Sequence, residues 1–541
     1  MSTILATTPL DESSDHNRLF LAYSNSAGAG LPPWLPAFPT SREAWHDLVK
    51  PAVGVRPGAR AAVVEETHDL SARLGTADDV LDKIQRARDG TTLFVVTGQQ
   101  PGALGGPLLA IYKVVTAVAL AERVEAILDR PCVPLYWCGA DDSDFNEARS
   151  FSCLAADASP FGSAMPQSAH TAGMPTGDID LEWPGQVWNT VKPLIDRFEK
   201  GGFVTDTING AFDRARDNGE LAAAILIGFA GGRAGVVDGR SRAVRKCAVQ
   251  LITDYVDQES EVKKDIDSEG RRLEEAGYHA QLTTGDDSGV FLLEDGIRKN
   301  VAASGRPRLI QTVRRAVENC SPGVALRNLV QDHVFEPVAV VLGPAEVAYR
   351  AQLSGVYARF GIPKPAVIPR MTATYIPPPL ASVLDTDDTL DIRAALTDPA
   401  GFAKQVYKRS IPKAAEAATR ELHKRVNDAV DEFAKSLGEG SSARALGRIR
   451  SRLDDLKART TQATAAVSEI GKATAIERWP FLPQLEAIVR PGAKPQERSL
   501  SSLVPFLFGG EPMTADLVAA ARGYTDDLLD GRINHVVYSS K

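Results

Sequence analysis

The chain has 541 residues, of which 44% are hydrophobic and 24% charged, and its formal net charge at pH 7 is −8. This composition is typical of folded proteins, and the length predicts roughly three to four domains. The negative charge argues against nucleic acid as a partner, because phosphate binding depends on basic surface. No apolar stretch reaches the ~20 residues that cross a bilayer, and the first residues lack the basic start and apolar run of a secretory signal. We therefore expect a cytoplasmic protein with no membrane partner.

The first part of the sequence predicts one repeat of an open parallel sheet. Residues 1–90 combine a Pro/Gly-rich entry with an amphipathic stretch, which predicts an N-terminal helical extension. A β-branched run follows at 93–97, then a glycine-rich turn, an apolar-rich helix at 108–128 and a second strand at 132–137. Strand, turn, helix and strand in this order form a βαβ unit. The predicted fold class is α/β, with a Rossmann-like, doubly wound parallel sheet over residues 91–375.

Four more short apolar runs follow along the chain. They lie at residues 235–238, 290–294, 338–342 and 366–369, with helical patterns between several of them. We expect them to be further strands, because parallel strands buried on both faces read as continuous apolar runs. Residues 155–325 are expected to form connecting insertions in this core.

The sequence becomes strongly helical after a proline run at residues 377–379. A charged helix is predicted from Lys413 to Leu437, followed by a break at GEGSS and a second arm. Apolar and small residues recur in the second arm in steps of three and four, at Leu446, Ile449, Leu453, Leu456, Thr460, Ala463, Val467 and Ile470. This spacing predicts a projecting antiparallel α-helical coiled coil within residues 376–485. Residues 486–541 are expected to return to the core.

The turn TGQQPGALGGP, residues 97–107, is the first candidate site. Four glycines between a strand and a helix let backbone N–H groups approach a ligand closely. Gln99 and Gln100 add neutral donors and acceptors, and Lys113 follows in the helix. We interpret the turn as a binding site for an anionic group. The alternative is a tight turn whose glycines serve packing.

The acidic run ADDSDFNE is the second candidate site. Asp141, Asp142, Asp144 and Glu147 follow a predicted parallel strand directly. Open α/β sheets bind ligands at this edge. The carboxylates could bind an ammonium group, act as a general base, or hold Mg²⁺ between nucleotide phosphates. The alternative is a solvated acidic loop.

The segment LGPAEVAYRAQL, residues 342–353, is the third candidate site. Glu346, Tyr349 and Gln352 are spaced three apart and share one face of the predicted helix. Arg370 ends the strand at 366–369 and could pair bidentately with a carboxylate or phosphate. A solvated helix face and a structural salt bridge are the alternatives.

Cysteine and histidine give no sign of a metal site or a nucleophile. The five cysteines form no CxxC pair, so reduced and mostly buried thiols are expected. None of the eight histidines lies in an HExxH or HxGH pattern, and no GxSxG elbow is present. Cys138 is a poor candidate nucleophile, because the adjacent carboxylates disfavour its thiolate.

These segments resemble the bacillithiol-biosynthesis cysteine-adding enzymes, the BshC family of cysteine ligases. VVTGQQPGALGGPLLAIYK is similar to the family's signature turn and helix, and PLYWCGADDSDFNEA to its acidic segment. Similar blocks follow in order: GYHAQ with VFLLEDGIRK, ALRNLVQD, VAVVLGPAEVAYRAQL with FGIPKPAVIPR, KPQERSLSSLVPFL, and the closing HVVYSS. The resemblance thus covers the chain from about residue 90 onward.

The resemblance implies a ligase that activates the carboxylate of cysteine with ATP and transfers it to the amine of glucosaminyl malate, giving an amide. It also implies a homodimer formed through the coiled coil. The residues expected to be catalytic are Asp142, Asp144 and Glu147. The residues expected to bind substrate or nucleotide are Thr97, Gly98, Gln99, Gln100, Gly102, Gly106, Pro107, Tyr112, Lys113, Trp137, Gly343, Pro344, Glu346, Tyr349, Gln352 and Arg370.

The sequence departs from the family pattern at three places. Ser143 stands where a histidine is usual, and Asn146 where an aspartate is usual. Residues 103–105 replace a bulkier stretch, which allows a different acyl acceptor. Two other functions stay open on this evidence: a nucleotidyltransferase-like activity on another small acid or sugar phosphate, and a non-catalytic coiled-coil scaffold.

Overall fold

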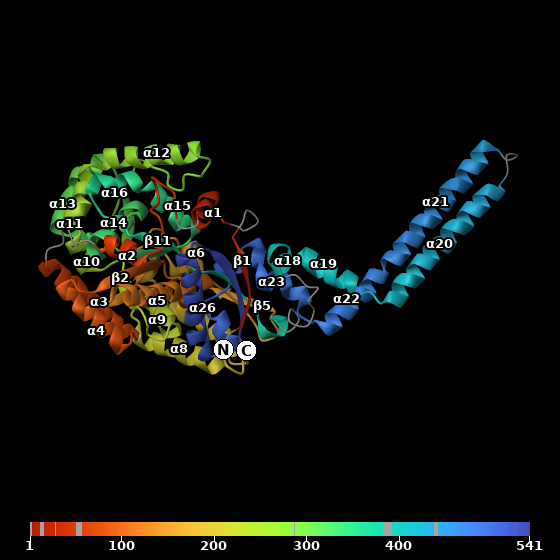
Figure 1. Ribbon diagram of the computed structural model, residues 1–541, viewed down its shortest axis with the longest axis horizontal. Coiled ribbons are helices and arrows are strands. Elements are labelled where there is room, and N and C mark those ends of the chain that lie inside the picture. The colour runs from red at the N-terminus through yellow and green to blue at the C-terminus, as the bar shows by residue number, and fades with distance from the viewer. Residues whose placement is uncertain are drawn as a thin grey trace. The chain divides into compact units, whose positions relative to one another are not determined.

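The computed structural model describes residues 3–10, 16–26, 29–49, 57–285, 287–381, 392–437 and 442–540 (Figure 1). Its contacts divide it into two compact units. The larger unit comprises Met1–Pro378 and Pro491–Lys541, and the smaller comprises Pro379–Arg490.

A parallel sheet of five strands forms the centre of the larger unit. The strands are β2 (Leu93–Gln99), β3 (Cys132–Cys138), β6 (Gly235–Asp238), β10 (Ala339–Leu342) and β11 (Ala366–Pro369). Their order is β11-β10-β2-β3-β6, so successive strands are added on one side of β2 and then on the other. This is the Rossmann strand order, and it confirms the predicted fold class. The direction of winding changes between β2 and β10, where ligands bind in such sheets.

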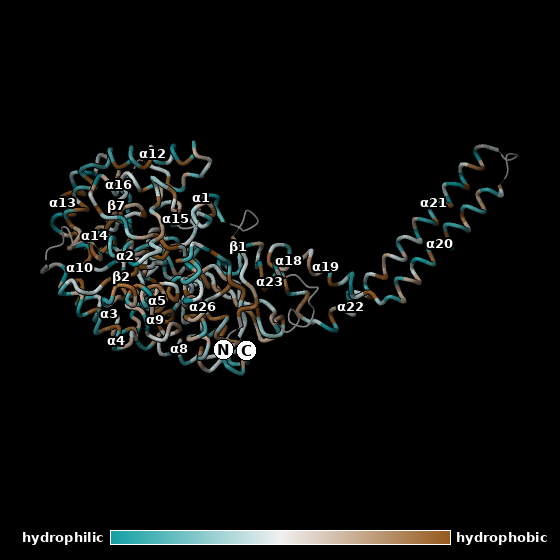
Figure 2. Tube along the Cα trace, in the orientation of Figure 1, coloured by the Kyte–Doolittle hydropathy of each residue, from teal (hydrophilic) through white to brown (hydrophobic). Residues whose placement is uncertain are grey.

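Two groups of helices cover the sheet. Helix α5 (Leu108–Leu128) packs on β2 and β3 and also contacts α9 (Asn218–Phe229) and α26 (Pro512–Leu529). Its surroundings explain why α5 is apolar nearly all round, and Figure 2 shows hydrophobic residues gathered around β2 and α5.

The second group of helices contains α3 (Pro57–Leu74), α4 (Asp78–Arg86) and α14 (Val324–Phe335). The ring of Phe335 lies 5.7 Å from that of Phe94 and 6.3 Å from that of Trp137, which the strand register places on the same face of the sheet.

The predicted strand at residues 290–294 does not belong to this core. It forms part of β7 (Asp287–Glu294), which pairs antiparallel with β8 (Ile297–Ala302) and β9 (Cys320–Pro322) in a separate sheet. An apolar run predicts a strand but not the sheet in which it pairs. The predicted strand at 235–238 is β6, which belongs to the core sheet although residues 155–325 as a whole are expected to form insertions.

The two ends of the chain meet in a third sheet. Strand β13 (Asn534–Ser539) pairs antiparallel with β1 (Thr3–Pro9) and parallel with β12 (Thr372–Tyr375). The strand β1 lies in the part expected to be helical. Residues after 491 therefore complete the larger unit.

The smaller unit is helical in its described parts. Helix α20 (Lys413–Ser436) runs antiparallel to α21 (Ala443–Ala465), and α22 (Val467–Arg478) follows (Figure 1). His423 bonds Thr464, and Lys457 pairs with Asp431, so these residues lie on the faces where the helices meet. The predicted seam is shifted in part, because Leu456 is 48% exposed while its neighbour Lys457 faces α20. The GEGSS break lies almost wholly outside the described residues.

No helix in the described part of the chain is both long and apolar enough to cross a membrane.

Candidate functional site

A cavity of about 300 Å³ lies at the carboxyl ends of β2, β3 and β10, where the winding of the sheet reverses. Three segments that are far apart in the sequence meet there: the start of the glycine turn, the acidic segment, and the turn from β10 into α15 (Pro344–Gln352). The predicted site residues that line it are Thr97, Gly98, Gln99, Gln100, Lys113, Trp137, Asp142, Glu147, Gly343, Pro344, Glu346, Tyr349 and Arg370. The fold therefore brings most of the candidate residues to one cavity.

Lys113 lies on α5 with its ammonium group buried beneath the cavity. The group donates to the Gly98 carbonyl at 2.6 Å and to Gln99 Oε1 at 2.9 Å, and it pairs with Glu346 Oε2 at 2.6 Å. Glu346 Oε2 also accepts the N–H of Gly343. Burial lowers the pKa of Lys113, although Glu346 opposes this shift. All three ammonium protons are donated within the protein. Lys113 therefore links β2 to the turn after β10 at the switch point, the place where the direction of winding changes.

Arg370 forms a buried ion pair with Glu497 of α24 (Gln496–Ser499). Both terminal nitrogens contact the carboxylate, and Nη1 lies 2.8 Å from Oε2. Glu497 also accepts the N–H of Ala373 at 3.2 Å. Burial raises the pKa of Glu497, but the charge and hydrogen bonds of Arg370 outweigh burial and lower it to about 2. The geometry matches the structural salt bridge that was one of the two predicted roles.

Glu147 reaches the cavity from the short helix α6 (Phe145–Ala148) and is exposed to solvent. Partial burial, and then the negative charges of Asp144 and Asp142, raise its pKa. Asp142 also lines the cavity, whereas Asp144 does not. Asp144 caps α6 instead, since its carboxylate accepts the N–H of Glu147 at 3.2 Å. Of the three residues predicted to be catalytic, Glu147 has the carboxylate best placed to accept a proton.

Arg327 of α14 is a cavity residue that was not predicted individually. Its Nη1 lies 3.3 Å from Asp142, and its Nη2 lies 3.5 Å from Asp141, which is fully buried. Burial raises the pKa of Asp141, but the charges of Arg327, Arg245 and Arg298 outweigh burial and hold it below its usual range. Asp141 thus fixes Arg327 from behind the cavity.

Arg498 of α24 is the second cavity residue that was not predicted individually. It is exposed, and its guanidinium makes no hydrogen bond or ion pair with any residue that the structure describes. Arg498 and Glu147 line the same cavity, and the charge of Arg498 lowers the pKa of Glu147. A single arginine forms no motif by which it could be predicted as a site residue. The available signal is that Arg327 and Arg498 lie in segments that resemble the family, ALRNLVQD and KPQERSLSSLVPFL.

The rest of the glycine turn is used for packing. Gly102, Gly106 and Pro107 do not line the cavity. A Cβ on Gly102 would lie 2.7 Å from the Cα of Gly106, and one on Gly105 would lie 2.8 Å from Ile225. Tyr112 is also outside the cavity, and its buried hydroxyl bonds that of Tyr538 at 2.9 Å. The structure brings only the first residues of this turn to the site.

Gln352 lies apart from the other two residues of its predicted triplet. Its side chain accepts the N–H of Leu282 at 2.7 Å and donates to the carbonyl of the same residue at 2.8 Å. It is 1% exposed and does not line the cavity. The expectation that Gln352 forms a cavity wall with Arg370 is therefore wrong: it holds an insertion against α15. Glu346 lies at the start of α15, next to the sheet edge. Gln352 lies six residues further along the helix and therefore away from that edge.

The residues that depart from the family pattern are not in the cavity lining. Ser143 accepts a hydrogen bond from Arg298 at 3.4 Å, and Asn146 is exposed. Residues 103–105 are buried in the packed part of the glycine turn.

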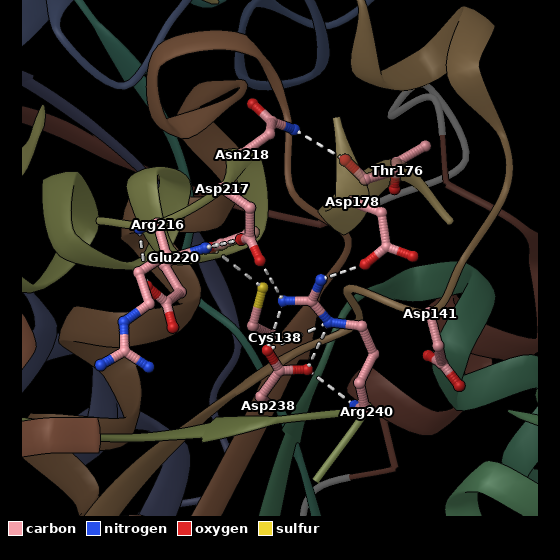
Figure 3. Close-up of polar contacts among 12 residues, drawn as sticks. Cys138, Asp141, Thr176, Asp178, Arg216, Asp217, Asn218, Glu220, Asp238 and Arg240 are labelled. Carbon is pink, nitrogen blue, oxygen red and sulfur yellow. Dashed lines mark hydrogen bonds and ion pairs between the residues drawn. The ribbon is translucent and has the colours of Figure 1, made fainter. Parts of the chain in front are cut away.

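A second charged cluster lies at the same edge of the sheet, at the end of β6 (Figure 3). Arg240 pairs there with Asp178, with Asp217 at 2.9 Å and with Asp238 at 2.6 Å. Figure 3 shows the three carboxylates around one guanidinium, with Cys138 beside them. Burial raises the pKa of Asp217, although Arg240 opposes it. None of these four ionised residues lines the cavity.

Burial also makes Cys138 a poor candidate nucleophile. Its thiol donates to the Gly219 carbonyl at 3.4 Å, and burial raises its pKa well above the ordinary value. Within the described ranges, no group of three or more His, Cys, Asp or Glu residues could hold a metal ion.

Comparisons with known proteins agree with the sequence motifs. A family model described as "Bacillithiol biosynthesis BshC, N-terminal Rossmann-like domain" matches residues 10–371. A protein from Koribacter versatilis named "Putative cysteine ligase BshC" is 28% identical over 490 residues, which cover 84% of this chain and 87% of the relative. Proteins of the same name from Natranaerobius thermophilus and Bacillus cereus are each 25% identical. Those two alignments cover 59% and 63% of this chain but only 61% and 65% of the relatives' lengths.

A solved structure described as a "putative arginyl t-RNA synthetase" from Campylobacter jejuni covers 88% of this chain and 98% of its own, with 10% identity and a TM-score of 0.22. That score is too low to indicate a shared fold.

Proposed function

This chain belongs to the BshC family of bacillithiol biosynthesis, because the family model matches residues 10–371, and we propose that it is a cytoplasmic ligase that joins cysteine to an amino sugar. The carboxylate of cysteine is activated at the expense of ATP. The amine of glucosaminyl malate then attacks the activated carbonyl carbon and forms an amide. The name of the relatives, "Putative cysteine ligase BshC", supports the cysteine half of this proposal.

The position of Glu147 in the cavity is the main support for this proposal. An amine attacks a carbonyl only in its neutral form, so a base must take a proton from the acceptor's ammonium group or from the attacking nitrogen. Glu147 faces the switch-point cavity, makes no ion pair among the described residues, and has a raised pKa. A carboxylate whose pKa is raised toward the working pH is a better base than an ordinary one.

ATP is proposed as co-substrate because a carboxylate is a poor electrophile and must be converted into a better one. The cavity lies at the position where Rossmann-like sheets bind nucleotides, and Gly98, Gln99 and Gly343 bring backbone close to it. Mg²⁺ would accompany the nucleotide, and Asp142 is the cavity carboxylate that could contact it.

A homodimer formed through the long helices is also part of the proposal. Leu422, Phe433 and Leu456 are 47%, 49% and 48% exposed. Leu422 and Leu456 each precede by one position a residue that contacts the other helix, His423 and Lys457. In antiparallel helices this common offset places both leucines on one face. Phe433 lies eleven residues, or about three turns, after Leu422 and shares that face, which a second copy would cover. Sedimentation of a Phe433→Glu, Leu456→Glu variant should show monomers where the native protein shows dimers.

The direct test is to incubate the protein with cysteine, glucosaminyl malate and Mg-ATP and to follow the cysteinyl amide by mass spectrometry. The native protein should form the product, and Glu147→Gln should form it about 10²- to 10⁴-fold more slowly. Omission of ATP should abolish product formation. No product from a folded native protein would refute the acceptor proposed here and favour a different amine or a non-catalytic role.

A further inference from the structure

The charges around the switch-point cavity are not evenly paired. Four cationic side chains line it: Lys113, Arg327, Arg370 and Arg498. Lys113 has no free proton, because Gly98, Gln99 and Glu346 accept all three. Arg370 has both terminal nitrogens on Glu497. These two cations hold the cavity together and have little capacity left for a ligand.

The other two cations are less firmly paired. Arg327 makes only long contacts, of 3.3 and 3.5 Å, with Asp142 and Asp141. Arg498 has no side-chain partner at all in the described part of the chain. An unpaired guanidinium on a cavity wall is a good partner for a carboxylate, which it can contact through two parallel hydrogen bonds.

The backbone that carries Arg498 is rigid, although its side chain is exposed. Glu497, one residue earlier, is fixed by Arg370 and Ala373. Gln496 accepts the N–H of Tyr375 at 2.8 Å and donates to the carbonyl of Tyr375 at 2.8 Å. Arg498 therefore extends toward the cavity from a firmly held helix, where little conformational freedom of the backbone is lost on binding.

Among the described residues that line the cavity, Arg498 is a cation without an ion-pair partner and Glu147 is a carboxylate without one. Arg498 lowers the pKa of Glu147, yet the two form no ion pair. A ligand that carries both an amine and a carboxylate would satisfy both groups at once. The carboxylate of cysteine does not fit this role well, because it is the reacting group and loses its charge when it is activated.

We propose that Arg498, supported by Arg327, binds a carboxylate of the amine acceptor and thereby selects acceptors that carry an acidic substituent. This inference rests on the proposed ligase function and names the group that recognises the malyl part of the substrate. Arg498 is a specificity-determining residue, and Glu147 takes the proton from the amine of the same molecule.

Binding can be tested without turnover, by titrating malate alone into the protein in a calorimeter. Arg498→Ala should weaken malate binding by roughly 10- to 100-fold, the range for a hydrogen-bonded charged group. Arg498→Lys should recover only part of the loss, because lysine cannot make the bidentate contact. Lys494→Ala, which removes an exposed cation outside the cavity lining, should bind malate like the native protein.

Turnover gives the second arm of the test. Arg498→Ala should raise KM for glucosaminyl malate with little change in kcat, and it should leave KM for cysteine and for ATP unchanged. With glucosamine, which lacks the malyl group, native and variant proteins should be equally poor. A variant that binds malate normally, or whose loss falls on cysteine or ATP instead, would overturn the assignment.

The experiments distinguish failure of the ligase function from failure of the carboxylate site at Arg498. If the native protein forms no amide but binds malate through Arg498, the ligase function fails and the carboxylate site stands. If the native protein forms the amide and Arg498→Ala has an unchanged KM, the function stands and the carboxylate site fails. Thermal melting of each variant separates both results from misfolding.

Discussion

Two charged regions lie at the same edge of the parallel sheet, and they differ in how their charges are used. At the end of β6, Arg240 is enclosed by Asp178, Asp217 and Asp238, and none of the four lines the cavity described above. At the ends of β2 and β10, cations and carboxylates surround a cavity of about 300 Å³, where Glu147 and Arg498 have no ion-pair partner among the described residues. The first region has the contacts of a structural clamp, and the second has room and unpaired charge for a ligand.

The comparison shows that charge density alone does not mark a site. Both regions contain a carboxylate whose pKa is raised mainly by burial, Asp217 in one and Glu147 in the other. Of the two, only Glu147 lines the cavity. The raised pKa becomes informative when it is combined with access and with a missing partner.

The sharpest test of the comparison is Glu147→Gln. The amide cannot accept a proton, so the rate of amide formation should fall by about 10²- to 10⁴-fold, the usual contribution of a general base. Thermal stability should change little, because the side chain is exposed. The rate is measured by mass spectrometry of the product. An active Glu147→Gln protein would show that the base lies elsewhere.

Arg370→Met tests the clamp behind the cavity. It leaves Glu497 buried without its partner, and the free energy of unfolding should fall by about 3–5 kcal/mol. Urea unfolding measures the loss. The double variant Arg370→Met, Glu497→Gln should recover part of it, because no charge is then buried alone. If the double variant is no more stable than the single one, the ion-pair explanation is incorrect.

Arg240→Met makes the matching change in the other region. It leaves three carboxylates close together without their shared cation, and we expect a loss of about 2–3 kcal/mol in the free energy of unfolding. The activity per folded molecule should stay close to that of the native protein. A selective loss of kcat in a folded Arg240→Met protein would mean that this cluster takes part in the reaction.

Asp144→Ala should have a smaller effect on stability. Its carboxylate caps α6, and removal of such a cap typically weakens a helix by about 1 kcal/mol. Because α6 carries Glu147, activity should fall, but by less than with Glu147→Gln. Asp144→Ser, which restores a capping side chain, should recover both properties. Equal losses in Asp144→Ala and Glu147→Gln would assign Asp144 a direct catalytic role.

The dependence of activity on pH should be the mildest of these effects near neutrality. Glu147 must be deprotonated to act as a base, so kcat/KM should rise as the pH rises through its raised pKa, and it should level off above that value. The residual rate of Glu147→Gln should lack this rise. A profile in which both proteins rise in parallel would assign the titration to another group.

Local patterns in the sequence predict much of this fold but not all of its pairing. Helix α5 and strands β6 and β11 have the predicted bounds, because long apolar periodicity and short β-branched runs are strong local signals. Strand β1 was missed because its partner β13 lies at the other end of the chain. The strand at 290–294 is predicted, but its partners β8 and β9 are not, since strand pairing is not a local property.

The candidate site shows the same division. The carboxyl ends of β2, β3 and β10 could be placed together from the βαβ pattern, which located Gly98, Asp142 and Gly343 correctly at one sheet edge. Whether a charged residue is free or already paired depends on residues far away in the sequence. Glu497 pairs with Arg370 and Glu346 with Lys113, and no spacing rule indicates either pair.

The pairing of Arg370 with Glu497 also fixes the order in which the larger unit can be completed during synthesis. The two residues are 127 positions apart, and the whole smaller unit is encoded between them. At typical bacterial elongation rates, the ribosome needs roughly 6 to 25 seconds to make such a stretch. During that interval Arg370 has no Glu497 to pair with, and Arg498 has not yet been added to the chain. A polypeptide released early, before residue 497, would therefore contain the parallel sheet but not a finished cavity.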